Sequence, residues 1–341
     1  MRRGALRSRW RVIALPAIRS RRLRWVAIGL SAAILAAAIS RSALSNQGEA
    51  DTEPQRAGHL APEEPIAPLP PEPWLDEARV ALGERLFRDP RLSGSGTVSC
   101  SSCHDLATNG ASGEAIDRGD GGELLAVNTP TVFNVGISFR LGWEGRFRHL
   151  TEHVASLIEN PAIMGASLDD VVDRLRSDPD LVATFLEVYG ERIDKENVVD
   201  ALVNFERSLV TPRAPLDRWL EGDADALSKI EVEGYQLFKS TGCASCHQGA
   251  AVGANLFQRQ GVFRPLVQPP PDIVRVPSLR NIAATAPYFH DGSAQTLGEA
   301  VRRMAKAQLN ASLSDEEVAR LVAFLVTLTG EYRGAPVRPA Q

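Results

Sequence analysis

Apolar residues recur at intervals of three and four along much of the chain. The stretch LDEARVALGERLF, residues 75–87, has this spacing, and SKIEVEGYQLFKSTG, residues 228–242, has it again. This repeat places apolar side chains on one face of a helix. Sustained alternation of apolar and polar residues is almost absent, and the two candidate short strands are PTVFNV at 130–135 and GVFRPLV at 261–267. The pattern therefore predicts a mainly α fold.

Capping residues and glycines mark the expected helix ends. A Ser or Thr followed three residues later by an acidic residue can satisfy free backbone N–H groups at a helix start. Such pairs are Ser167 with Asp170, Thr296 with Glu299, and Ser314 with Glu317. Gly190 and Gly330 follow helical runs and are predicted to end them, because glycine adopts a left-handed backbone conformation readily.

The two helical stretches quoted first indicate an internal duplication. In each of them a glycine precedes a phenylalanine by four residues, Gly83 before Phe87 and Gly234 before Phe238. Residues four apart share one helix face, and a glycine on that face allows close approach of another helix. We therefore predict two copies of one helical module.

All four cysteines lie in two C-x-x-C-H pentapeptides, one in each copy. They are Cys100, Cys103 with His104, and Cys243, Cys246 with His247. This pattern is typical of c-type haem attachment, in which the cysteines bond the porphyrin and the histidine faces the iron. The alternatives are a zinc knuckle and a thioredoxin-like redox pair. No cysteine is left over, so we expect two covalent haems and no disulfide.

Composition divides the chain into five segments. Residues 1–40 combine an arginine-rich start with an apolar run, as in a signal peptide or an N-terminal membrane anchor. Residues 41–73 form a Pro- and Glu-rich linker, 74–225 an N-terminal haem domain, 226–332 a C-terminal haem domain and 333–341 a tail. The formal net charge is only -4, so nothing indicates nucleic-acid binding.

The ligand opposite each haem histidine decides what a haem does. Methionine favours electron transfer, whereas an open position lets a small molecule bind. Apart from Met1 the chain has only Met164 and Met304. Met304 lies on the predicted helix after the second motif, where it is either a distal ligand or a core residue.

Several further motifs resemble one known family in their order along the chain. They are LGERLFRDPRLSGSGTVSCSSCH, NTPTVFNVG, GWEGR, IENPAIMG, PSLRNIAATAPYFHDGSAQTLGEAVRRM and EEVARLVAFLVTLTG. From about residue 75 to residue 330 the chain resembles the bacterial di-haem cytochrome c peroxidases, including MauG-like enzymes. The resemblance implies a periplasmic protein with two cytochrome c-like domains. In such proteins a C-terminal His/Met haem receives electrons, and an N-terminal haem reduces hydrogen peroxide.

The resemblance also implies roles for single residues. His104 would be the proximal ligand of the peroxide-reacting haem, and His247 with Met304 would ligate the electron-transfer haem. Trp143 matches a tryptophan between the haems that can relay an electron, or it is a packed interface aromatic. His290 matches a histidine near the haem, with a chemical or a structural role.

A calcium site is implied at the junction of the two domains. Asn128, Thr285 and Pro287 match its oxygen ligands, because a hard cation accepts amide and backbone carbonyl oxygens. All three are also ordinary turn residues.

Two departures from the family pattern bear on the first haem. Asp120 stands where classical members have a histidine that blocks the iron, and a carboxylate is a poor ligand for such an iron. We therefore expect an iron that is open or water-bound without reductive activation. Ile163 stands where the family has a glutamate that moves protons, and isoleucine cannot do so.

His153, ten residues before Ile163, is the candidate replacement. Histidine titrates near neutral pH and performs proton transfer in other peroxidases. His153 is an acid-base group, a sixth ligand that closes the site, or an exposed residue of a surface helix.

The expected function is reduction of hydrogen peroxide with electrons from a small cytochrome c or cupredoxin. The alternatives are a di-haem electron-transfer or redox-sensing protein, and a MauG-like oxidase of a protein partner. A homodimer and a membrane tether are also expected from the resemblance and from the N-terminal apolar run.

Overall fold

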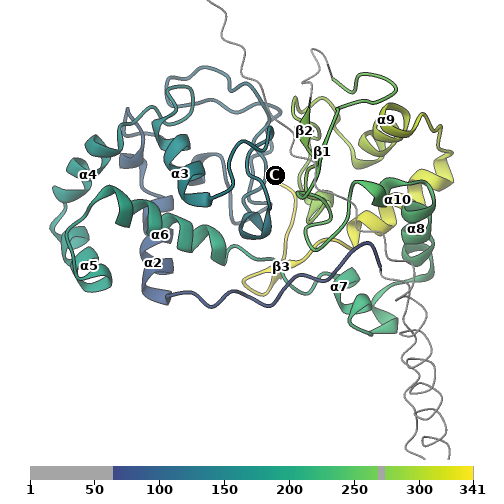
Figure 1. The fold of residues 1–341 in the computed structure, drawn as a ribbon, viewed down its shortest axis with the longest axis horizontal. Coiled ribbons are helices and arrows are strands. Elements are labelled where there is room, and N and C mark those ends of the chain that lie inside the picture. The colour runs from purple at the N-terminus through teal and green to yellow at the C-terminus, as the bar shows by residue number, and fades with distance from the viewer. Residues whose placement is uncertain (1–63, 268–272, 341) are drawn as a thin grey trace, which may run out of the picture. The chain divides into compact units, whose positions relative to one another are not determined.

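Helices form most of the regular structure in the computed structural model, which describes residues 64–267 and 273–340 (Figure 1). The predicted signal or anchor at 1–40 and the linker up to residue 63 lie outside the described residues. No helix within the described part is long and apolar enough to cross a membrane. The prediction of a mainly α fold is confirmed.

Nine α-helices and two small sheets are present in the described ranges. The helices are α2 (Glu77–Phe87), α3 (Leu150–Glu159), α4 (Leu168–Arg176), α5 (Pro179–Tyr189), α6 (Lys195–Ser208), α7 (Pro215–Leu220), α8 (Lys229–Ser240), α9 (Leu297–Leu309) and α10 (Asp315–Val326). The antiparallel pairs are β1 (Phe257–Gln258) with β2 (Val274–Arg275), and β3 (Glu331–Tyr332) with β4 (Ala335–Pro336).

The predicted capping pairs begin three of these helices. The side chains of Ser167, Thr296 and Ser314 accept hydrogen bonds from backbone N–H groups at the starts of α4, α9 and α10. Gly190 ends α5 with φ of 71°. Gly330 is not a helix cap, because α10 ends at Val326. Gly330 instead allows a close approach, since a Cβ there would lie 2.0 Å from the carbonyl oxygen of Thr211.

The two predicted strands do not form. Residues 130–135 lead through a turn into a 3-10 helix, Val135–Ile137. Asn134 has φ of 60°, and Gly261 in the other candidate has φ of 89°. Both values lie outside the extended region that a strand requires, so apolar composition alone was misleading at these places.

The duplicated module has the same helix contact in both copies. A Cβ at Gly83 of α2 would lie 2.0 Å from the carbonyl oxygen of Ala201 in α6. A Cβ at Gly234 of α8 would lie 2.0 Å from the carbonyl oxygen of Arg320 in α10. In each pair the phenylalanine four residues later meets another ring, Phe87 against Phe205 at 5.2 Å and Phe238 against Phe324 at 5.0 Å. The glycines therefore allow the close helix packing that the sequence predicted.

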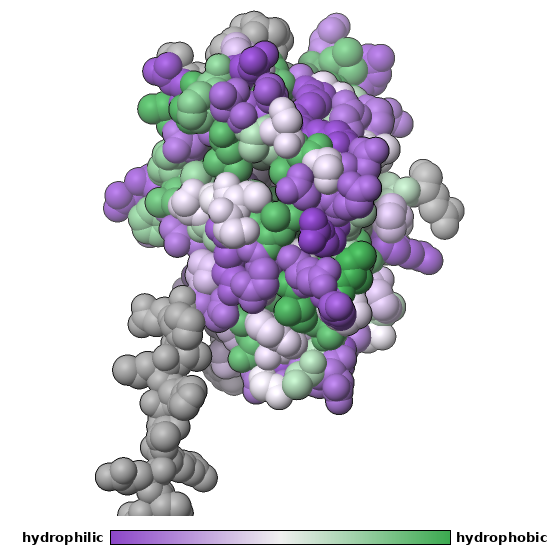
Figure 2. Space-filling view, turned by 90° about the vertical axis from the view of Figure 1, so that its right-hand side faces the viewer, coloured by the Kyte–Doolittle hydropathy of each residue, from purple (hydrophilic) through white to green (hydrophobic). Residues whose placement is uncertain are grey.

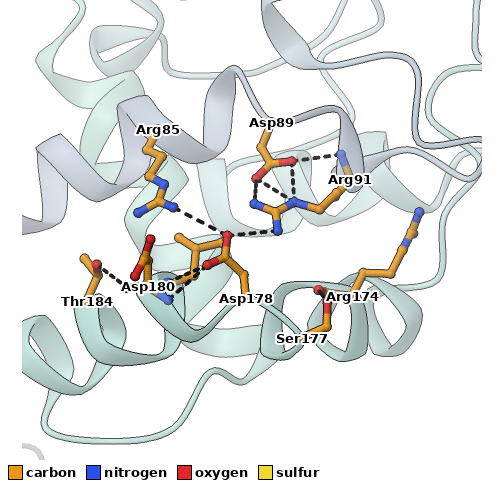
Figure 3. A network of polar contacts seen from close by, with 9 residues as sticks. Arg85, Asp89, Arg91, Arg174, Ser177, Asp178, Asp180 and Thr184 are labelled. Atoms are coloured by element: carbon orange, nitrogen blue, oxygen red, sulfur yellow. Dashed lines mark hydrogen bonds and ion pairs between the residues drawn. The ribbon is translucent and has the colours of Figure 1, made fainter.

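A polar network fixes the loop before the first C-x-x-C-H motif (Figure 3). Arg91 lies between Asp89 and Asp178 and bonds their carboxylates at 2.6 and 3.1 Å. Arg174 of α4 donates to the backbone carbonyl of Ser93 at 2.5 Å. Because these contacts join α4 and the start of α5 to residues 89–93, the loop has a defined path toward the motif.

Residues 64–267 and 273–340 form two main hydrophobic cores, and each core receives a segment from the other end of the chain. The first core is built on α2 to α6 and includes Val337 near the C-terminus. The second is built on α8 and α10 and includes Ile66 from the predicted linker and Leu216 of α7. Residues 64–73 therefore differ from a free tether, because Ile66 is fully buried and Glu64 accepts a hydrogen bond from Tyr235.

Two equivalent asparagines meet at the contact between the cores. Asn134 and Asn281 both adopt a left-handed conformation directly before a 3-10 helix. Their side-chain amides donate to the same hydroxyl, that of Thr211, at 2.7 and 3.0 Å. All three residues are buried. Thr211 lies on the segment that connects α6 to α7, so the network joins the two modules to this connection.

Candidate functional site

The first C-x-x-C-H motif forms a short 3-10 turn, Cys100–Ser102. The backbone N–H of His104 donates to the carbonyl of Cys100 at 3.0 Å, so histidine and cysteines share one turn. The Nδ1 atom of His104 lies 3.0 Å from the carbonyl of Gly110, which places the ring proton on Nδ1. Nε2 therefore remains available as a ligand.

The second motif repeats this turn at Cys243–Ser245. The backbone N–H of His247 donates to the carbonyl of Cys243 at 3.0 Å. The His247 ring is half-buried near Phe238, with ring centroids 6.5 Å apart. Its Nδ1 lies near backbone groups of Val252 and Pro277 but makes no well-formed hydrogen bond. Burial lowers the pKa of His247 to about 4, so its imidazole is neutral, as a metal ligand must be.

The cysteine surroundings fit thioether bonds better than a zinc site. Burial raises the pKa of Cys100 to about 12 and that of Cys103 to about 11, so neither is a thiolate. No group of three or more His, Cys, Asp or Glu side chains that could hold a metal ion occurs in the described ranges. All four thiols are free of disulfides in the structure. The residues therefore fit two c-type haems.

Trp143 and His290 lie together at the contact between the modules. Their ring centroids are 6.1 Å apart, and the rings meet edge to face. Asn128 joins them, because its carbonyl accepts from Trp143 Nε1 at 2.8 Å and its N–H donates to the carbonyl of His290 at 2.7 Å. The two aromatic residues occupy equivalent places, each two residues after the start of an isolated β-bridge, Leu141 with Phe147 and Tyr288 with Ala294.

The proposed calcium ligands lie along the same contact. Asn128 uses its side-chain amide to donate to the carbonyls of Glu114 and Ala115, both at 3.1 Å. The Thr285 hydroxyl donates to the carbonyl of Ile282 at 3.3 Å, and Pro287 is buried. Calcium binding by Asn128, Thr285 and Pro287 stays a prediction.

His153 is half-buried on α3 rather than exposed. Its ring packs 5.3 Å from that of Phe147, and a Cβ at Gly142 would lie 3.9 Å from its Nε2. Burial lowers the pKa of His153 to about 4, and the charges of His104 and Arg275 act in the same direction. His153 is therefore neutral at pH 7 and lies near the first haem-attachment histidine.

Asp120 and Ile163 are the two residues that depart from the family pattern, and both are held by contacts with neighbouring side chains and backbone. The Asp120 carboxylate accepts from the backbone N–H of Ser95 at 2.8 Å and from the Ser95 hydroxyl. Ile163 packs against the first core, and its carbonyl accepts from the N–H of Asp120 at 2.8 Å. Asp120 is thus engaged by Ser95, and position 163 itself carries an apolar side chain that cannot transfer a proton.

Met304 lies half-buried in a small apolar cluster with Leu266, Val267, Phe289 and Ala307. It is the eighth residue of α9. The eighth residue of the equivalent helix α3 is Leu157. The two modules therefore differ at this position, with a thioether in one and an aliphatic side chain in the other.

Sequence reasoning did not single out the buried charged residues Glu206 and Arg275. Glu206 of α6 is 8% exposed, and burial raises its pKa to about 8. Its apolar spacing with Leu202 and Leu209 was a signal that it faces the core. Arg275 of β2 is 9% exposed, and no local pattern marks its position.

Known proteins share both the sequence and the fold. A model of the family described as di-haem cytochrome c peroxidase matches residues 77–225, and a cytochrome c model matches 231–329. A cytochrome c551 peroxidase of Nitrosomonas europaea is 39% identical over 290 residues, covering 81% of this chain and 87% of the relative. The cytochrome c peroxidase Ccp of Escherichia coli is 38% identical over 300 residues, covering 83% of this chain and 63% of the relative.

A solved structure is also similar. The crystal structure of a MauG-like protein associated with microbial copper homeostasis has a TM-score of 0.68 and 28% identity, and covers 80% of this chain and 95% of that protein.

Proposed function

The chain belongs to the di-haem cytochrome c peroxidase family of oxidoreductases, whose members carry two covalently bound haem c groups, and we propose that it reduces hydrogen peroxide in the periplasm. The balanced reaction is one H₂O₂, two protons and two electrons giving two H₂O. The electrons come from a small cytochrome c or cupredoxin.

The difference between the two modules is the observation that carries this proposal. The second module has Met304 at the eighth position of α9, and the first has Leu157 at the same position of α3. A methionine ligand favours electron transfer, whereas a site without one can accept a small molecule. We assign electron entry to the module with His247 and Met304, and peroxide to the module with His104. The domains 74–225 and 226–332 each hold one haem.

When bound, the haems supply iron that binds oxygen ligands and stores electrons. The chain supplies proton transfer through His153, whose neutral imidazole can accept a proton from peroxide and return it to the leaving oxygen. Trp143 supplies an oxidisable indole at the contact between the modules, held in place by Asn128 and packed against His290. Asn128, Thr285 and Pro287 are the proposed ligands of a calcium ion there.

Donor binding is assigned to the C-terminal module, whose surface mixes apolar and polar residues. Figure 2 shows hydrophobic residues interspersed with hydrophilic ones on this face. Short-lived protein interfaces have about the same apolar fraction as the rest of a protein surface. A small redox protein could therefore dock without a large apolar patch. Formation of a homodimer and of a membrane tether stays a prediction.

Purified, haem-loaded protein tests the proposal. We expect two haem equivalents per chain, a high-spin iron component in the electron paramagnetic resonance spectrum of the oxidised protein, and peroxide-dependent oxidation of a reduced small cytochrome c. Two haems without such oxidation would instead favour the redox-sensing alternative, which the apolar Ile163 supports. Oxidation of a protein partner in place of the cytochrome would favour a MauG-like activity.

A further inference from the structure

Asn109 is fully buried five residues after His104, the histidine of the first motif. Both ends of its side-chain amide form hydrogen bonds. Nδ2 donates to the carbonyl of Ala284 at 2.8 Å, and Oδ1 accepts from the backbone N–H of Ala111 at 2.9 Å. Ala284 ends the 3-10 helix Ile282–Ala284 in the C-terminal module. Asn109 therefore joins the loop after the first motif to the other module.

The peptide group held by Asn109 is the one that orients the imidazole of His104. The carbonyl of Gly110 lies 3.0 Å from Nδ1 of His104. This carbonyl and the N–H of Ala111 belong to one planar peptide group. Since Asn109 accepts from that N–H, it sets the direction in which the carbonyl points. Gly110 has φ of 69°, and a Cβ there would lie 2.8 Å from Oγ1 of Thr131, so this path of the chain needs glycine.

The loop after the second motif repeats the turn but lacks the amide. The backbone N–H of Gly253 donates to the carbonyl of Gln248 at 2.9 Å, as the N–H of Gly110 does to that of Asp105 at 2.8 Å. The residue before this second glycine is Val252, whose side chain has no hydrogen-bonding group. A side-chain amide at this position thus supports the first histidine and not the second.

We propose that Asn109 is a positioning residue for His104, which it orients through the peptide between residues 110 and 111 while tying that peptide to the C-terminal module. The inference deepens the function proposed above, in which His104 serves the peroxide-reacting haem. A hydrogen bond to the second nitrogen of a metal-ligating histidine sets the orientation and the basicity of its ring. Hydrogen bonds in series polarise one another, so the bond to Ala284 strengthens the bond to His104.

Resonance Raman spectra of the reduced, haem-loaded protein are the direct test, because the iron–histidine stretching band responds to the hydrogen bond at Nδ1 without any turnover. Asn109→Ser keeps an oxygen that can accept from the N–H of Ala111 but is too short to reach the carbonyl of Ala284. We expect this variant to shift the band of the first haem to lower frequency. Asn109→Ala removes both bonds, so it should shift the band further and lower peroxide turnover about tenfold.

Thr211→Val is the control for a general loosening of the contact between the modules. It removes the hydroxyl that accepts from both Asn134 and Asn281, but it leaves every hydrogen bond of Asn109 in place. The band of the first haem should stay at its wild-type frequency in this variant. An equal shift in Thr211→Val and Asn109→Ser would overturn the inference, because the contact as a whole would then position His104.

Hydrogen–deuterium exchange of the peptide that spans residues 105–112 gives a second readout, which needs no haem signal. Exchange should be faster in Asn109→Ala than in wild type, since the N–H of Ala111 loses its acceptor. If Asn109→Ala fails to bind two haems, the band of Asn109→Ser decides, and a band at the wild-type frequency there overturns the inference. Shifted bands in a protein whose wild type consumes no peroxide would confirm the positioning of His104 and refute only the proposed function.

Discussion

Replacing Gly83 by alanine tests the helix contact that supports the first haem site. The added Cβ would lie 2.0 Å from the carbonyl oxygen of Ala201 and 2.7 Å from the Cβ of Phe205, so α2 and α6 must separate. Phe87 would move with α2, and its ring now lies 6.3 Å from that of His104. The substitution therefore perturbs both packing and the haem environment.

The expected magnitude follows from two opposing effects. Alanine favours a helix over glycine by about 1 kcal/mol, whereas overpacking in a tight contact costs about 3 kcal/mol. We expect a net loss of about 2 kcal/mol in the free energy of unfolding, or ~4–8 °C in Tm. Gly234→Ala should behave alike, because its Cβ would lie 2.0 Å from the carbonyl oxygen of Arg320.

Gly298→Ala is the matched control in helix α9. Its nearest neighbour would be Val318 Cγ1 at 3.6 Å, an ordinary contact, so the variant should be about as stable as wild type or up to ~1 kcal/mol more stable. Urea unfolding followed by far-UV circular dichroism measures all three variants, and the haem absorption spectrum reports on His104. If Gly83→Ala proved as stable as Gly298→Ala, the close contact between α2 and α6 would be disproved.

Three further predictions concern buried or engaged carboxylates. Folding raises the pKa of Glu206 from 4.5 to about 8, so the contribution of Glu206 to stability is complete below pH 4.5 and disappears as the pH rises through 8. Glu206→Gln should therefore be more stable than wild type at pH 9 but not at pH 4. Urea unfolding at both pH values measures this difference. Asp217→Asn leaves Arg280 buried without its counter-charge and should lower the free energy of unfolding by about 3–5 kcal/mol, whereas a loss below 1 kcal/mol would contradict this burial. Asp120→Ala should leave the spin state of the oxidised protein unchanged, because Asp120 binds Ser95, and any change in the electron paramagnetic resonance spectrum would argue against that assignment.

Local chemistry made part of the fold predictable. The caps at Ser167, Thr296 and Ser314 act within one helical turn, and the glycine before each phenylalanine marks a close contact whatever the partner. The C-x-x-C-H turns are likewise defined by five residues. These features needed no knowledge of distant parts of the chain.

Long-range contacts explain what the sequence did not reveal. Arg275 is held by hydrogen bonds to the carbonyls of Gly142 and Trp143, which lie more than a hundred residues earlier. Gly330 was interpreted as a helix stop, but its close contact is with Thr211. A predictor limited to neighbouring residues has no access to such pairings.

The exchange of segments between the two cores bears on how the protein can be divided. Ile66 is buried with the second module and Val337 with the first. If the chain were cut near residue 212, each half would keep a segment that packs in the other core. Each half would also lack the segment that packs in its own core. Expression of either half alone is therefore expected to give aggregation-prone material. An isolated haem module would need the buried segment from the other end of the chain fused to it.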